Sequence, residues 1–220
     1  MRIGRRIRAG VFAILAGATL AAWGDQPVGI TATLLHVDTV HAGKPFRIER
    51  EADNFNQIDP DFALTSRPCP PYCVQPMQLA PGVETIGELE LLDYLRRAGD
   101  DKAGVVVIDS REEHWLLRTG IIPGAIHLTW TQLHPAHTEP AQIADTLQFV
   151  FGAARTGALW NFESARTAVF YCNGVWCGQS PTNIKQLLAL GYPAHKLKWY
   201  RGGMQSWKSL GFNTAPVLLK

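Results

Sequence analysis

Short apolar runs alternate with segments of helical periodicity along the second half of the chain. Residues 105–108, 167–171 and 196–200 are rich in β-branched and aromatic side chains, which predicts buried strands, and residues 125–128 predict a fourth strand. Amphipathic or helix-capping patterns predict helices at residues 84–98, 112–117, 140–151 and 204–210, and another that opens at Ser180-Pro181. This order implies an α/β fold, with a central parallel sheet flanked by helices and joined by right-handed crossovers.

The first third of the chain is less regular. Residues 30–40 and 45–49 contain strand-like patches, and residues 52–61 are polar and rich in turn formers. Residues 67–81 contain five prolines, which exclude a regular helix and a central strand. We therefore expect an irregular N-terminal arm that wraps the domain surface. Farther along, residues 152–166 are expected to be a connection that ends in a turn of helix.

The composition bounds the function classes. The 220 residues are 46% hydrophobic and carry a formal net charge of +2, which fits one domain with a real core and gives no electrostatic reason for a nucleic acid partner. The excess of positive charge lies in four arginines at the very start, Arg2, Arg5, Arg6 and Arg8.

Those arginines precede an apolar stretch at residues 9–23 and a cleavage candidate at Ala22-Trp23-Gly24. This layout predicts a secretory signal, a mature start near Asp25 and a periplasmic protein. An uncleaved membrane anchor and a buried N-terminal helix are the alternatives, and Arg5-Arg6 also invites a twin-arginine interpretation. Export would place the protein in an oxidising compartment.

The four cysteines are Cys69, Cys73, Cys172 and Cys177. An even number of thiols in an exported protein suggests disulfides, and four thiols allow three pairings. Cys69-Pro70-Pro71-Tyr72-Cys73 fits either a local staple for the arm or a redox pair. A zinc site is the last choice because the spacings are unusual and no histidine is adjacent, so we expect neither metal nor cofactor.

Cys172 is the strongest candidate for chemistry. It follows a predicted buried strand and precedes a loop of mostly small residues, Asn173, Gly174, Val175, Trp176, Cys177, Gly178 and Gln179, before the helix at Ser180. Backbone amides and a helix N-terminus at that place favour a thiolate and can cradle an anion bound to sulfur. Asp109 ends another predicted strand, so both side chains are expected at one edge of the sheet.

Three ordered blocks resemble the rhodanese-like family. They are the cysteine loop with its flanking strand and helix, the segment GVVVIDSREEHWLLRTGIIPGAIHL at residues 104–128, and the closing segment YRGGMQSWKSLG at residues 200–211. Ile121 stands where the family usually has a histidine. TSRPCPPYCVQPM at residues 65–77 and the CNGVWC loop further resemble a bacterial rhodanese-like subfamily associated with PQQ-dependent (quinoprotein) alcohol catabolism.

The resemblance implies a rhodanese-like three-layer fold at residues 84–213. Residues 1–24 would be a signal peptide or anchor, residues 25–83 a proline-rich extension and residues 214–220 a tail. It also implies that Cys172 is the nucleophile and that Asp109 and Arg111 support the loop, the alternative for this pair being a surface salt bridge.

His114 and His127 are either bases or merely hydrogen-bonded, and Tyr72, Trp176 and Trp199 either line a pocket or belong to the core. Trp207 and Gly202-Gly203 are expected to be core and turn.

The loop departs from the family pattern because it lacks the arginine that helps to bind an anionic donor, and Gln179 stands near that place. Cys177 could instead attack a Cys172 persulfide and close a disulfide.

Two functions therefore compete. One is a periplasmic enzyme that handles sulfane sulfur or thiol redox state, resembles a thiosulfate sulfurtransferase, and has a small sulfur donor and a thiol acceptor. The other is a non-catalytic accessory module whose partner is a periplasmic quinoprotein dehydrogenase or cytochrome. A phosphatase of the related fold needs Cys-x5-Arg, and Gly178 excludes it.

Overall fold

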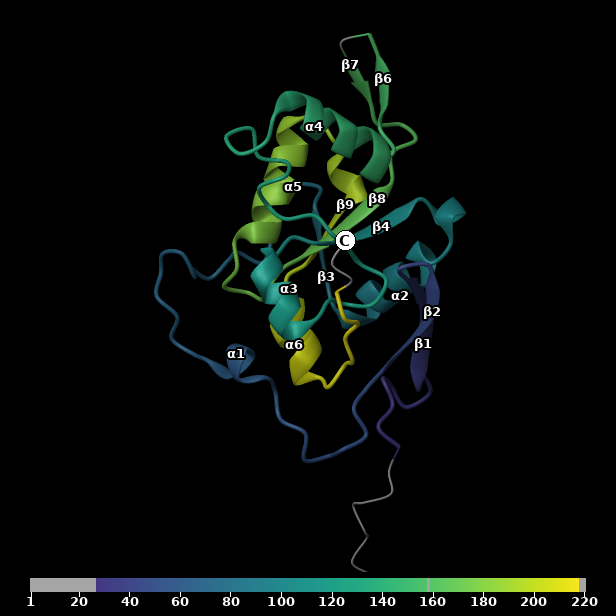
Figure 1. Cartoon of the computed structure of the whole chain (residues 1–220), viewed down its shortest axis with the longest axis vertical. Helices are drawn as coiled ribbons and strands as arrows, with labels where there is room; N and C mark the ends of the chain where they lie inside the picture. The colour runs from purple at the N-terminus through teal and green to yellow at the C-terminus, as the bar shows by residue number, and fades with distance from the viewer. Residues whose placement is uncertain (1–26, 158, 218–220) are drawn as a thin grey trace, which may run out of the picture.

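A five-stranded parallel sheet forms the centre of the protein (Figure 1). The computed structural model describes residues 27–157 and 159–217. The strands follow the order β3-β9-β8-β4-β5 across the sheet. Their bounds are β3 (Glu84–Ile86), β4 (Val105–Asp109), β5 (Ile126–His127), β8 (Thr167–Tyr171) and β9 (Leu197–Tyr200). The predicted α/β fold class is confirmed.

Helices cover both faces of this sheet because side chains alternate between the faces along each strand. Val107 of β4 belongs to one buried cluster and Ile108 to a second. Three helices contribute to the first cluster: α2 (Glu88–Ala98), α3 (Glu113–Thr119) and α6 (Gly203–Ser209). Two contribute to the second: α4 (Pro140–Asp145) and α5 (Gln179–Ala189). The result is three layers, with the core divided between the two faces (Figure 1).

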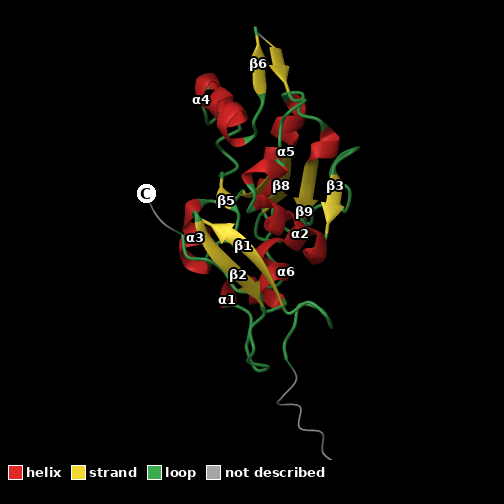
Figure 2. Ribbon diagram, turned by 90° about the vertical axis from the view of Figure 1, so that its right-hand side faces the viewer, coloured by secondary structure: helices red, strands yellow, loops and turns green. Residues whose placement is uncertain are grey.

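The N-terminal extension begins with an antiparallel hairpin that packs beside the domain (Figure 2). Its strands are β1 (His36–His41) and β2 (Lys44–Glu49), close to the two predicted patches. The Thr39 hydroxyl donates to the carbonyl oxygen of Leu95 at 2.7 Å, which fastens the hairpin to the end of α2. A single helical turn, α1 (Pro60–Ala63), follows, and residues 67–81 contain no regular helix or strand.

Several predicted boundaries are wrong in instructive ways. The predicted helix at residues 84–98 begins only at Glu88, because residues 84–86 are edge strand β3 paired with β9. The predicted helix at residues 140–151 changes after Asp145 to a π-helical turn, Thr146–Val150. Residues 152–166 contain a short antiparallel hairpin, β6 (Ala154–Thr156) and β7 (Leu159–Asn161), which projects from one end of the molecule (Figure 2).

Two further observations concern the predicted export signal and the question of a membrane-spanning helix. The arginine-rich start and the cleavage candidate lie outside the residues that the structure describes. Between residues 27 and 217, where the chain is described, no helix combines the length and apolar character needed to span a bilayer.

Candidate functional site

Helix α6 holds the cysteine loop in place at the end of β8. The backbone N–H groups of Met204 and Gln205 donate to the carbonyl oxygens of Cys172 and Asn173, each at 2.9 Å. Gly203 precedes them with a φ of 56°, and a Cβ atom there would lie 2.3 Å from the Cys172 carbonyl oxygen. Only glycine allows this close approach, so the Gly-Gly segment positions the loop in addition to making a turn.

Cys172 lies inside a cradle of hydrogen-bond donors. Its side chain is only 2% exposed, and the Ser180 hydroxyl donates to its sulfur at 3.1 Å. Burial by itself raises the pKa of the Cys172 thiol, but hydrogen bonds from Cys177, from Ser180 and from the backbone N–H of Gly174 outweigh it, and the pKa is lowered overall. The Cys172 sulfur also lies 3.4 Å from the Cys177 carbonyl oxygen, to which the thiol donates when it is protonated. The hydrogen bonds from Ser180 and Gly174 favour the thiolate form of Cys172.

Cys177 has the opposite character, although it belongs to the same loop. Burial raises the pKa of its thiol first, and the neighbouring Cys172 raises it further, so the pKa lies well above its ordinary value. Its thiol interacts with the Cys172 sulfur and lies 3.6 Å from the Gln179 Oε1 atom. The two cysteines thus form an asymmetric pair in which the Cys172 thiol ionises more readily than the Cys177 thiol.

Ser180 has a different role from the one its position suggested. Helix α5 begins at Gln179 with Gly178 at the N-cap, so Ser180 lies within the first turn and does not cap the helix. The Trp199 indole N–H donates to the Ser180 Oγ atom at 3.1 Å, which leaves the hydroxyl proton free for Cys172. Trp199 is a core residue, 1% exposed, that orients the donor of the nucleophile.

Asp109 and Arg111 form a buried ion pair rather than a surface salt bridge. Both side chains are 0% exposed, and the guanidinium contacts the carboxylate at 2.7 Å. Burial lowers the pKa of Arg111, but the charge of Asp109 and their hydrogen bonds raise it overall. The Tyr171 hydroxyl donates to Asp109 at 2.9 Å and accepts from the backbone N–H of Ile122 at 3.1 Å. Because Tyr171 directly precedes Cys172, this network fixes the start of the loop.

The two predicted histidines lie near this network but differ in their surroundings. His127 is hydrogen-bonded through Nε2 to the Arg111 carbonyl oxygen at 2.7 Å, so it serves the support of the loop. His114 is exposed, and its Nδ1 atom lies 3.4 Å from the Glu112 carboxylate. Neither histidine hydrogen-bonds a loop cysteine among the contacts of the described residues.

The extension packs directly against the loop. The backbone N–H of Gln75 donates to the Val175 carbonyl oxygen at 2.8 Å, and the Arg67 guanidinium lies 4.0 Å from the centre of the Trp176 ring. Gln205 accepts from the Trp176 indole at 2.9 Å and donates to the Phe62 carbonyl oxygen at 2.9 Å, which joins α6, the loop and the extension. Sequence reasoning missed Gln205 and Arg67. Both lie in segments that carry the family resemblance, but nothing in the sequence shows which residue of a segment contacts the loop.

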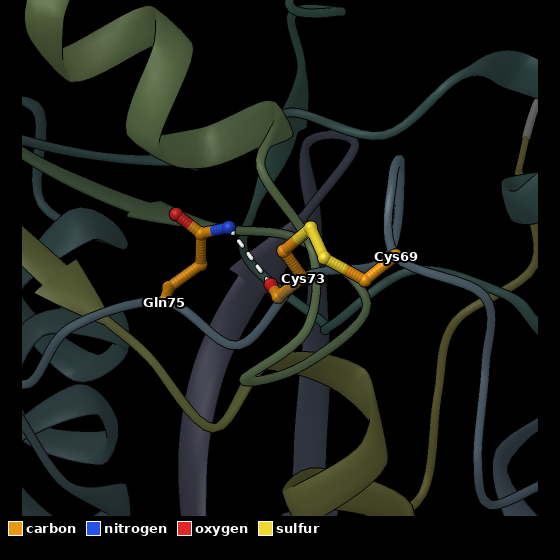
Figure 3. The surroundings of a disulfide bond; sticks show 3 residues. All are labelled: Cys69, Cys73 and Gln75. Carbon is orange, nitrogen blue, oxygen red and sulfur yellow. Dashed lines mark hydrogen bonds between the residues drawn. A yellow bond between two sulfur atoms is a disulfide. The ribbon is translucent and has the colours of Figure 1, made fainter.

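Cys69 and Cys73 form a disulfide within the extension (Figure 3). The Gln75 side chain donates to the Cys73 carbonyl oxygen at 2.9 Å (Figure 3). The disulfide also holds Tyr72, whose ring centre lies 5.5 Å from that of Trp176 in an edge-to-face arrangement. The pair is thus a local disulfide of the arm, and it also borders the loop. Cys172 and Cys177 are free thiols.

A cavity of about 350 Å³ opens in front of the loop. Its walls include four aromatic side chains, Tyr72, Trp115, Trp130 and Trp176. Cys177 and Gln179 also line the cavity, and Cys172 is not among the described residues that line it. Trp115 and Trp130 were also missed, because the sequence around a tryptophan gives no signal that separates a pocket wall from the core. Within the described residues, no three side chains of His, Cys, Asp or Glu converge as a metal site would require.

A parallel sheet covered by helices on both faces, with a cysteine cradled at the end of a central strand, is the arrangement of the rhodanese-like class of protein. The model of the rhodanese-like domain matches residues 91–210, more than half of the chain, and this protein belongs to that family. At the level of the family, the domain indicates sulfurtransferase or thiol chemistry.

Other comparisons add little. No curated protein matches significantly. One similar solved structure is a protein of unknown function from Rhodopseudomonas palustris, described as a possible tyrosine phosphatase, with 21% identity and a TM-score of 0.44 over 62% of this chain and 88% of that one. Another is a Bacillus halodurans protein with 15% identity and a TM-score of 0.41 over 62% of this chain and 85% of that one.

Proposed function

We propose that the protein carries sulfane sulfur on Cys172 and resolves the resulting persulfide with Cys177. The observation that carries this proposal is the asymmetry of the two neighbouring thiols. Cys172 is the better candidate for the nucleophile because the pKa of its thiol is lowered, whereas the pKa of the Cys177 thiol is raised. The geometry agrees, since the Ser180 hydroxyl and the backbone N–H groups of Ser180 and Gly174 all donate to the Cys172 sulfur.

In the first step, the Cys172 thiolate attacks the outer sulfur of a donor such as thiosulfate. A bond forms between the two sulfurs, the donor's bond between its two sulfurs breaks, and sulfite leaves with the electron pair. The persulfide on Cys172 is an anion. The Gly174 and Ser180 backbone N–H groups that stabilise the thiolate would also stabilise this persulfide.

In the second step, Cys177 attacks the inner sulfur of the persulfide. A disulfide forms between Cys172 and Cys177, and the outer sulfur leaves as hydrosulfide with the proton that Cys177 gives up. The products are one disulfide and one hydrosulfide from one persulfide and one thiol. An external thiol must then reduce the disulfide before the next cycle.

The accessory module remains the second candidate, and the lining of the cavity favours it. Among the described lining residues no lysine or arginine faces a dianionic donor, while Glu112 adds a negative charge. In this version the protein would be periplasmic, or anchored through its N-terminus, and would dock to a quinoprotein dehydrogenase or cytochrome of PQQ-dependent alcohol oxidation. The aromatic cavity would then bind a partner's side chain or a small organic ligand without chemistry.

Intact-mass measurement of the exported protein before and after reduction and thiosulfate treatment separates the two candidates. The sulfur-carrying function predicts a mass gain of one sulfur atom that Cys172→Ser abolishes and Cys177→Ser preserves and prolongs, since the resolving thiol is gone. No gain of sulfur in any variant, from thiosulfate or from an inorganic polysulfide, would leave the accessory module. The starting mass also reports whether the segment before Asp25 has been removed.

A further inference from the structure

The thiol that faces the cavity is the one with the weaker tendency to ionise. Cys177 lines the cavity at the mouth of the loop, whereas Cys172 is not among the described lining residues. A molecule that enters through the cavity therefore reaches Cys177, whose sulfur lies 3.6 Å from the Oε1 atom of the lining residue Gln179, before it reaches Cys172. Once a Cys172–Cys177 disulfide has formed, Cys177 is the sulfur open to attack and Cys172 is the sulfur that must leave.

The walls of the cavity fit an organic molecule better than a small inorganic anion. Trp115 and Trp176 have ring centres 6.4 Å apart, and Tyr72 meets Trp176 edge-to-face at 5.5 Å. Trp130 closes another side, where its indole N–H donates to Glu112 at 3.3 Å. A volume of about 350 Å³ falls in the range of pockets for small organic ligands, and aromatic walls contribute most to the binding of flat apolar groups.

The charges of the cavity disfavour an anion. Glu112 and His114 are the charged or titratable side chains among its described lining residues, apart from Cys177 and Tyr72, and they contact each other at 3.4 Å. Any positive charge on His114 is thus offset by Glu112. The nearby guanidinium of Arg67 packs on the Trp176 ring and is not one of the lining residues. A negatively charged ligand would find a carboxylate and no free cation among the described residues that line the cavity.

We propose that the cavity binds an uncharged or cationic organic thiol with an apolar body about the size of an aromatic ring, and that this thiol reacts at the Cys177 sulfur. The proposal rests on the proposed function, because it names the reductant of the Cys172–Cys177 disulfide. Small anionic thiols are disfavoured by the carboxylate of Glu112 and make no use of the aromatic walls.

The chemistry requires two molecules of the thiol. The first attacks Cys177 Sγ as a thiolate, so a mixed disulfide forms, the bond between the two cysteines breaks, and Cys172 leaves as a thiolate that accepts from Ser180. The second attacks the sulfur of the bound organic molecule, and Cys177 leaves and takes up a proton. One protein disulfide and two thiols give one protein dithiol and one organic disulfide, with two electrons transferred. The lowered pKa of Cys172 makes it the better leaving group.

The test begins with the full-length reduced protein, oxidised with diamide so that no sulfur donor is involved. Reduction of the Cys172–Cys177 disulfide is followed with three probes of similar chain length at the sulfur: benzyl mercaptan, 2-mercaptoethanol and 2-mercaptoethanesulfonate. Each second-order rate constant is divided by that for the urea-unfolded oxidised protein, which removes differences in intrinsic reactivity. We expect benzyl mercaptan to be favoured by about tenfold over 2-mercaptoethanol, and the sulfonate to be slowest.

Two variants identify the source of the preference. Trp130→Ala should remove about threefold or more of the advantage of benzyl mercaptan and leave 2-mercaptoethanol unchanged. Glu112→Gln, which keeps the shape of the side chain, should accelerate the sulfonate by about threefold and leave the neutral probes unchanged. Equal normalised rates for the three probes, or failure of diamide to form the disulfide, would overturn the proposal.

A second measurement does not depend on the disulfide. In Cys172→Ser, where Cys177 is the free thiol of the loop, benzyl methanethiosulfonate should modify Cys177 about tenfold faster than sulfonatoethyl methanethiosulfonate after the same normalisation. Equal rates contradict the inference about the cavity but leave persulfide formation at Cys172 intact. Conversely, a clear preference without any persulfide in the mass measurement would contradict the proposed function alone.

Discussion

The reactivity of the site depends on a few hydrogen bonds around one sulfur. The position of Cys172 at the end of a buried strand predicted a favoured thiolate, and the resemblance to the rhodanese-like family implied that Cys172 is the nucleophile. The path from Trp199 through Ser180 to Cys172 could not be predicted, since it joins the loop to helix α5 and α5 to a strand residue 19 positions after Ser180. Sequence spacing places residues on elements, but only packing decides which polar atoms meet.

Ser180→Ala tests this path. The variant removes the hydroxyl that donates to Cys172 at 3.1 Å and leaves the backbone N–H in place. We expect the pKa of Cys172 to rise and its alkylation at mildly acidic pH to slow by about tenfold, as loss of a hydrogen bond to a charged group predicts. The pH dependence of iodoacetamide labelling gives the answer. Ser209→Ala, on the exposed side of α6, is the matched control and should leave the profile unchanged.

The buried ion pair makes a second prediction at this scale. Arg111→Met leaves the Asp109 carboxylate buried without its partner, so the free energy of unfolding should fall by about 3–5 kcal/mol. Urea denaturation measures this value. Arg118→Met breaks the largely exposed pair with Asp61 and should cost only about 0–1 kcal/mol. Similar losses in both variants would show that burial does not distinguish the two pairs.

At the scale of elements, buried strands were predicted well and short exposed ones were not. Strands β4 and β8 were predicted nearly to the residue because both faces are buried, which makes them continuously apolar. Hairpin β6–β7 was missed because each strand has three residues and is largely exposed, so no alternation develops. Edge strand β3 merged with the following helix because three residues carry too little pattern.

Helix α6 provides the test at this scale. Gly203→Ala places a Cβ atom 2.3 Å from the Cys172 carbonyl oxygen at a φ of 56°, so α6 and the loop must separate. We expect destabilisation beyond the roughly 1–2 kcal/mol of the positive φ itself, together with a higher pKa of Cys172. Gly104→Ala is the control, because its φ is 60° and no atom lies within 4 Å of the added Cβ. Equal losses of stability and an unchanged Cys172 would contradict the proposed role of α6.

At the scale of the whole molecule, the extension completes the site. The rhodanese-like domain supplies the cysteine loop, and the extension supplies Tyr72 as a wall of the cavity and Arg67 as the partner of Trp176. The prolines predicted an irregular arm, but not where it would lie. That placement depends on hydrogen bonds such as Gln75 to Val175, which join residues 100 positions apart and follow no sequence pattern.

Removal of the Cys69–Cys73 disulfide tests this contribution. Cys69→Ser with Cys73→Ser should lower the free energy of unfolding by about 2 kcal/mol, the value for a short closed loop. With Tyr72 released, Cys177 should be alkylated severalfold faster in a Cys172→Ser background, as residue-resolved mass spectrometry would measure. Val74→Ser, an exposed position in the same segment, should change neither quantity. An unchanged rate at Cys177 would mean that the extension does not shield the cavity.

The asymmetry of the two loop thiols is the central claim, and residue-resolved alkylation of the reduced wild-type protein against pH tests it most directly. Labelling of each cysteine is normalised to its own plateau at high pH, so that differences in access cancel. Because the pKa of Cys172 is lowered and that of Cys177 is raised, the midpoint for Cys172 should lie below that of an ordinary thiol and the midpoint for Cys177 above it. Coincident midpoints, or a lower midpoint at Cys177, would contradict the account.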